Sequence, residues 1–187
     1  MGLTFIKALT ASSSSTLDFV DGTSDVVFDN TYNEYQFRFV NLHPATQHVS
    51  PQFQVNATDD AGGGYDTSLI TSTHFVAYHN EGGTDTTLAY SSSHDLTQGS
   101  AYQNLFYNLD YENDESCSGV LTLYDPSSTT YVKHFTAQMQ GNHHSSNYSM
   151  ISYVAGYIND TTAIDEISFK FSSGNIDEGT IYMYGVS

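Results

Sequence analysis

Apolar and polar side chains alternate with a period of two along most of this chain. Ile167, Phe169 and Phe171 alternate with polar residues near the C-terminus, and the same pattern runs through Tyr35–Phe39. A period of two is typical of β-strands that bury one face. No window carries the i, i+3, i+4, i+7 apolar stripe of an amphipathic helix. The pattern therefore predicts an all-β protein.

Eleven short segments fit this pattern and are bounded by Gly, Asn, Asp, Ser or Pro. We expect one antiparallel two-sheet β-sandwich over residues 1–187, of jelly-roll or lectin-like type, because so many short strands must pack as two layers. Residues 1–12 are a candidate N-terminal anchoring strand. Residues 56–68, 81–98 and 141–149 are expected to be long loops. The expected strands are Leu3–Leu9, Thr16–Val20, Tyr35–Phe39, Gln52–Val55, His74–Tyr78, Leu105–Leu109, Val120–Tyr124, Tyr131–Gln138, Met150–Ile158, Ile167–Phe171 and Ile181–Tyr184.

The net charge of the chain limits the classes of partner that it is expected to bind. The 187 residues include 21 acidic and 4 basic side chains, a formal net charge of −17. Binding to nucleic acid or to an anionic membrane surface is not expected, because basic side chains supply most of that affinity. No apolar run approaches the roughly 18 residues of a membrane-spanning helix, so membrane insertion is not expected either. A single cysteine, Cys117, excludes an internal disulfide framework.

The densest acidic segment is a candidate metal site. Asp110, Glu112 and Asp114 alternate within six residues, and their carboxylates could converge on Ca²⁺, which prefers six to eight oxygen ligands. The segment lacks the glycine and the distal glutamate of an EF-hand loop. The alternative is a solvated acidic turn between two strands. No other cofactor is expected.

Histidine offers a second set of candidate ligands. The adjacent pair His143 and His144 could bind a transition metal on the symmetry axis of an oligomer, and the alternative is a pair of surface histidines. His74 and His79 are five residues apart, so one regular strand would point them to opposite faces.

The motifs of catalysis are missing. No Gly-x-Ser-x-Gly nucleophile elbow occurs. The acidic pairs Asp165–Glu166 and Asp177–Glu178 are adjacent in sequence, so strand geometry points the two carboxylates of each pair apart rather than together as a glycosidase requires. We therefore expect no catalytic residues and no enzymatic activity.

Tyrosine is abundant, with 15 residues in the chain. Combined with Ser, Thr and Asn, tyrosine is typical of recognition surfaces, because its ring offers a rigid apolar face and its hydroxyl a polar tip. The alternative is that tyrosine simply covers exposed strand faces. The sequence leaves these two interpretations open.

Five blocks of sequence resemble one known family. The most distinctive block reads Phe-Val-Asn-Leu-His-Pro-Ala-Thr, and the Asn113–Glu115 turn also matches. Together the blocks extend over nearly the whole chain, which is similar to a family of tail- or fibre-type virion proteins from tailed phages that infect marine bacteria and cyanobacteria. The resemblance supplies no functional residues. The blocks are Met1–Ala8, Leu17–Gly22, Phe39–Thr46, Tyr124–Phe135 and Phe169–Ile181.

The resemblance implies a structural protein on the virion surface, assembled in the host cytoplasm. Its expected function is that of a host-attachment module on the tail or its fibres, with a host-surface glycan and other virion proteins as partners. The alternative is a capsid decoration or cement protein on the head. Either function suits a homo-oligomer, with a trimer favoured. A polysaccharide depolymerase is disfavoured by the missing motifs.

Overall fold

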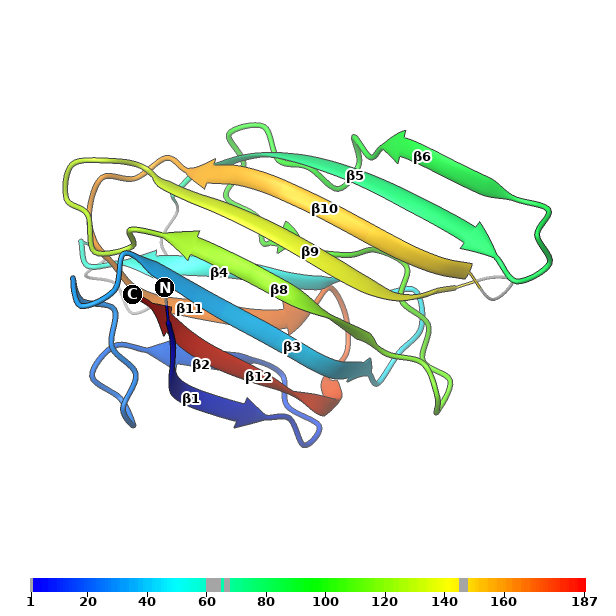
Figure 1. Ribbon diagram of the computed structural model, residues 1–187, viewed down its shortest axis with the longest axis horizontal. Coiled ribbons are helices and arrows are strands. Elements are labelled where there is room, and N and C mark those ends of the chain that lie inside the picture. The colour runs from blue at the N-terminus through cyan, green and yellow to red at the C-terminus, as the bar shows by residue number, and fades with distance from the viewer. Residues whose placement is uncertain (1, 60–64, 66–67, 145–147) are drawn as a thin grey trace.

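The computed structural model describes residues 2–59, 65, 68–144 and 148–187, and these residues form an all-β fold (Figure 1). The described part of the chain contains no helix, and none that could span a membrane. The strands are β1 (Leu3–Thr10), β2 (Leu17–Val20), β3 (Glu34–Pro44), β4 (Pro51–Ala57), β5 (Ile70–Asn80), β6 (Thr86–Tyr90), β7 (Gln103–Asn104), β8 (Cys117–Tyr124), β9 (Lys133–His143), β10 (Tyr148–Ile158), β11 (Ile164–Phe171) and β12 (Ile176–Val186).

The strands form two antiparallel sheets that pack face to face, so the expected two-sheet sandwich is confirmed. The larger sheet has the order β1-β12-β3-β8-β9-β10-β5-β6, and the smaller one β2-β11-β4-β7. Figure 1 shows the strands of the larger sheet side by side, with the smaller sheet behind them. One face of the larger sheet is therefore packed against the smaller sheet, and no described strand covers its other face.

Aromatic side chains join the two sheets. Phe53 on β4 packs edge-on against Phe135 on β9 with ring centroids 5.0 Å apart, and Phe169 on β11 contacts Phe37 on β3 at 5.3 Å. All four are buried. Each fully buried phenylalanine contributes about 1.5–3 kcal/mol relative to its exposed state, so these contacts fix how the sheets are stacked.

Two expectations about individual strands were wrong. Residues 105–109 form no strand: Leu105, Phe106 and Leu109 fill the core from a loop, in which Leu109 makes isolated bridges to Val49 and His143. A buried apolar run is therefore not by itself evidence of a strand. Conversely β6 lies within the expected loop 81–98. It is an edge strand whose side chains are mostly exposed, so it lacks the buried face that makes a strand visible in sequence.

The first strand belongs to the larger sheet. β1 pairs with β12 from Leu3 to Thr10, and its other edge carries no partner among the described residues. Gly2 and Ser187 exchange two backbone hydrogen bonds, so the two ends of the chain lie together at this edge (Figure 1). An anchoring function of residues 1–12 would act through this open edge.

Candidate functional site

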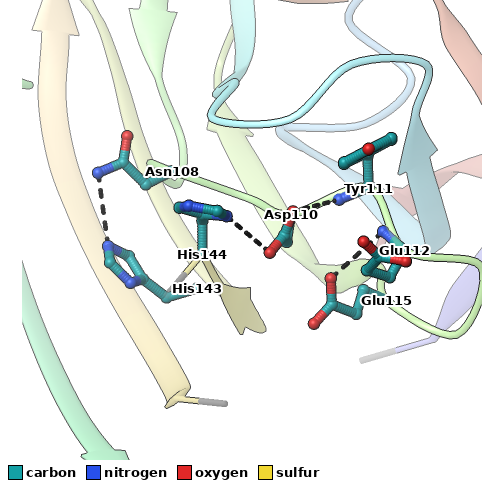
Figure 2. Close-up of polar contacts among 7 residues, drawn as sticks. All are labelled: Asn108, Asp110, Tyr111, Glu112, Glu115, His143 and His144. Carbon is teal, nitrogen blue, oxygen red and sulfur yellow. Dashed lines mark hydrogen bonds and ion pairs between the residues drawn. The ribbon is translucent and has the colours of Figure 1, made fainter. Parts of the chain in front are cut away.

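The structure does not bring the three predicted calcium ligands together. Asp110 turns toward His144, with its Oδ2 atom 2.7 Å from Nδ1, and its Oδ1 atom accepts a hydrogen bond from the backbone of Tyr111 (Figure 2). The backbone of Glu112 is capped instead by the side chain of Glu115 at 3.3 Å. Asp110 therefore acts as the partner of a histidine.

The third carboxylate, Asp114, lines a polar hollow of about 430 Å³ together with His43 and Glu178. Glu115 also lines this hollow. Burial raises the pKa of its carboxyl group, and the nearby negative charge of Asp110 raises it further. In the described part of the chain, no three His, Cys, Asp or Glu side chains form a group that could hold a metal ion. Calcium at Asp110, Glu112 and Asp114 stays a prediction.

The histidine pair lies in a larger cluster of rings. The ring centroids of His48 and His144 are 3.4 Å apart. The side-chain nitrogen Nδ2 of Asn108 lies 3.5 Å from Nε2 of His143 (Figure 2). The ring of His94 stacks on that of Tyr107, with centroids 4.3 Å apart. Burial lowers the pKa of the fully buried His74 and of the half-buried His94 and His143. We define the histidine cluster as His48, His74, His94, Tyr107, His143 and His144.

The central part of the outer face of the larger sheet differs from the rest of the molecule in its lack of charge. Because side chains alternate along a strand, this face receives every second residue. Among the described residues, its central part over β5, β10, β9 and β8 has no Asp, Glu, Lys or Arg, although the chain has 21 acidic residues. The outward residues there are Thr71, Thr73 and Phe75, then Tyr153, Ala155 and Tyr157, then His134, Thr136 and Gln138, and finally Val120, Thr122 and Tyr124.

Strand register arranges these residues in three rows that cross the strands. The first row contains the large side chains Phe75 and Tyr153, directly opposite each other, and continues to Gln138 and Val120. The middle row contains only small side chains: Thr73, Ala155, Thr136 and Thr122. The third row begins at Thr71 on β5 and continues with the rings of Tyr157, His134 and Tyr124, of which Tyr157 and His134 are directly opposite each other.

Two adjoining hollows lie along the middle row. One, of about 330 Å³, is bordered by Phe75, Tyr153 and Gln138, and the other, of about 390 Å³, by Tyr157, His134 and Tyr124. They meet at Thr136 and Ala155, which line both. We call the two hollows together the trough. Its floor is the middle row, and its walls are the first and third rows.

The walls of the trough are exposed and ordered by contacts with neighbouring side chains. Phe75 and Tyr153 are 41% and 36% exposed, and their rings stack at 5.0 Å with an interplanar angle of 16°. Tyr124, which is 37% exposed, has its hydroxyl 3.2 Å from that of Thr136. The opposing walls are four residues apart along each strand, or about 13–14 Å. This is wide enough for a ring-sized ligand to lie on the floor.

Sequence reasoning predicted strands over His74–Tyr78 and Met150–Ile158 but did not single out their aromatic residues. Phe75, Tyr153 and Tyr157 lie on these strands, β5 and β10. The two strands are neighbours in the sheet, and Phe75 lies opposite Tyr153. These two residues are 78 positions apart in sequence, so no local pattern shows that they pair. The structure supports the view that tyrosine lies on exposed strand faces, and here these faces enclose a hollow.

In comparisons with known proteins, no family model, curated protein or solved structure matches the chain.

Proposed function

We propose that this chain is a non-enzymatic attachment module on the outside of a tailed-phage particle, and that it binds a host-surface carbohydrate in the trough. The observation that carries the proposal is the trough itself: exposed rings along both walls and hydroxyl groups on the floor. A sugar ring has an apolar C–H face and a rim of hydroxyls, so it matches an aromatic wall combined with a few polar groups. The resemblance to phage virion proteins supports the location.

The position of the trough suits attachment. It lies over β8, β9, β10 and β5, whereas the chain ends and the open edge of β1 lie at the opposite edge of the larger sheet, beyond β3 and β12 (Figure 1). A module held to the particle through β1 would leave the trough open to the host surface. The open edge can accept a strand from a neighbouring chain.

The first test removes one wall of the trough. We expect Tyr153→Ala to weaken carbohydrate binding at least tenfold, about 1.4 kcal/mol, because a wall ring at the centre of a site supplies much of its contact. Binding is measured on a glycan array and then by calorimetry with the strongest ligand. Tyr111→Ala is the matched control, since Tyr111 is 42% exposed but lies outside the trough. Equal loss in both variants would argue against the trough.

A second candidate function is capsid decoration, and the open edge of β1 favours it. Leu3 and Phe5 on this strand are 45% and 56% exposed, and a neighbouring capsid chain could cover them by pairing with β1. The molecule would then be a cement protein, and the trough a surface without a ligand.

Immunogold electron microscopy of purified phage separates the two functions. With an antibody to this chain, we expect gold at the tail or its fibres. Gold distributed around the head would favour decoration, and no gold on intact particles would argue against a virion protein of either kind. An antibody to the major capsid protein provides the positive control for the head.

A further inference from the structure

We infer that the ligand of the trough is a neutral glycan chain, bound lengthwise across the strands β5, β10, β9 and β8. This inference rests on the proposed function, because it names the chemical class and the orientation of the carbohydrate. Three properties of the described residues carry it: the charge around the trough, its length, and the hydrogen-bonding groups that it presents.

The first property is the absence of a cation for an acidic sugar. No Lys or Arg lines the trough in the described part of the chain. Lys133 is fully buried, and its ammonium group donates to three backbone carbonyls. Lys170, on the smaller sheet, lies 4.1 Å from the centre of the Tyr102 ring.

Arg38, an exposed basic residue on β3, lies next to the first row of the trough. It is paired with Val120 at the end of the first row, but its guanidinium lies over Tyr184, 5.2 Å from the ring centre and farther from the trough. A carboxylated or sulfated sugar would therefore have no paired cation, and it would approach a molecule with a net charge of −17. Repulsion of this kind disfavours acidic ligands.

The second property is the length of the trough. Its floor runs from Thr73 through Ala155 and Thr136 to Thr122, so it crosses four neighbouring strands. Three interstrand spacings of about 4.8 Å make a floor of about 14 Å. Both hollows are open to solvent along this line. A floor of this length accommodates several linked sugar rings, which favours an internal stretch of a chain over a single terminal sugar.

The third property is the chemistry of the polar groups. The hydroxyls of Thr73 and Thr136, and the amide of Gln138, are exposed at the floor or the wall. Hydroxyl and amide groups both donate and accept hydrogen bonds, as the hydroxyls of a neutral sugar do. None of them carries a charge that would compensate an anion.

The experiment compares neutral and acidic carbohydrates on the intact chain. The neutral probes are maltohexaose, cellohexaose and mannohexaose, and the acidic probes are dextran sulfate, alginate and polygalacturonate. We expect at least one neutral probe to bind at least tenfold more tightly than every acidic one. With the best neutral series, the affinity should rise at least tenfold from disaccharide to tetrasaccharide and then level off at the hexasaccharide. Tyr153→Ala should lose this binding, and Tyr111→Ala should retain it.

The outcomes distinguish this inference from the proposed function. If an acidic probe binds best and Tyr153→Ala removes the binding, the trough binds carbohydrate but the inference of a neutral ligand is wrong. If disaccharide and hexasaccharide bind equally, the lengthwise orientation is wrong. If no probe binds, or if Tyr153→Ala leaves binding unchanged, both the proposed function and this inference are overturned. Melting temperatures of both variants close to that of the parent chain verify that each is folded.

Discussion

Replacing Lys133 by Met is expected to lower the free energy of unfolding by about 3–5 kcal/mol, because three carbonyl oxygens lose their charged hydrogen-bond donor. Lys133 lies on the inner side of β9 and is fully buried. Methionine fills much of the same volume but leaves three carbonyl oxygens without their donor, and hydrogen bonds to a charged group contribute about 1.5–3 kcal/mol each. The acceptors of the Lys133 ammonium are Tyr131 at 3.1 Å, Asp160 at 3.3 Å and Thr162 at 2.6 Å.

Urea unfolding at pH 7 measures this effect, and Lys170→Met is its matched control. Lys170 is a partly exposed lysine on β11 whose ammonium contacts the Tyr102 ring, so its replacement should cost no more than about 1 kcal/mol. Comparable losses in the two variants would contradict a special structural function of Lys133. Burial lowers the pKa of Lys133, while the nearby carboxylates of Asp160 and Asp125 raise it.

The sequence predicted the features that depend on neighbouring residues, and it missed those that depend on contacts between distant segments of the chain. The alternation in Ile167–Phe171 is a local property, and it identified β11 because each apolar residue there faces the core. The segment around Leu105 has the same apolar composition but fills the core from a loop, which no local pattern distinguishes from a strand. The edge strand β6 has no buried face, and therefore no signal.

The candidate sites follow the same rule. The acidic turn was conspicuous in sequence because its carboxylates are close together along the chain, yet Asp110 pairs with His144, which follows β9, while Asp114 lines a separate hollow. The trough was inconspicuous because its walls come from β5, β8, β9 and β10. Only strand register places Phe75 beside Tyr153, and register depends on the whole sheet.

Acid is expected to destabilise the fold through the histidine cluster, and His74→Leu should remove a large part of this effect. His74 is fully buried on β5, and neither of its ring nitrogens is paired in a hydrogen bond within the described part of the chain. Burial lowers its pKa from 6.5 to about 4; the backbone of His94 opposes this shift most, the charge of His94 adds to it, and the charge of Asp95 opposes it.

The sign follows from the protons bound in each state. Between pH 6.5 and 4 the unfolded chain protonates this histidine and the folded chain does not, so stability falls as the pH falls. The contribution of His74 reaches about 3 kcal/mol near pH 4 and does not grow below it. The free energy of unfolding is measured with urea from pH 7.5 to 4.5. As the pH falls from 6.5 to 5, this free energy in His74→Leu should rise by about 2 kcal/mol relative to that of the parent chain.

His79→Leu is the matched control, because His79 lies on the exposed side of the same strand. This variant still contains His74, so its stability should decline between pH 6.5 and 5 as steeply as that of the parent chain. Parallel pH profiles for the parent and His74→Leu would show that His74 does not bind its proton differently in the folded and unfolded states. Burial also lowers the pKa of His94 and His143, so a residual acid sensitivity in His74→Leu is expected, because both of these histidines remain.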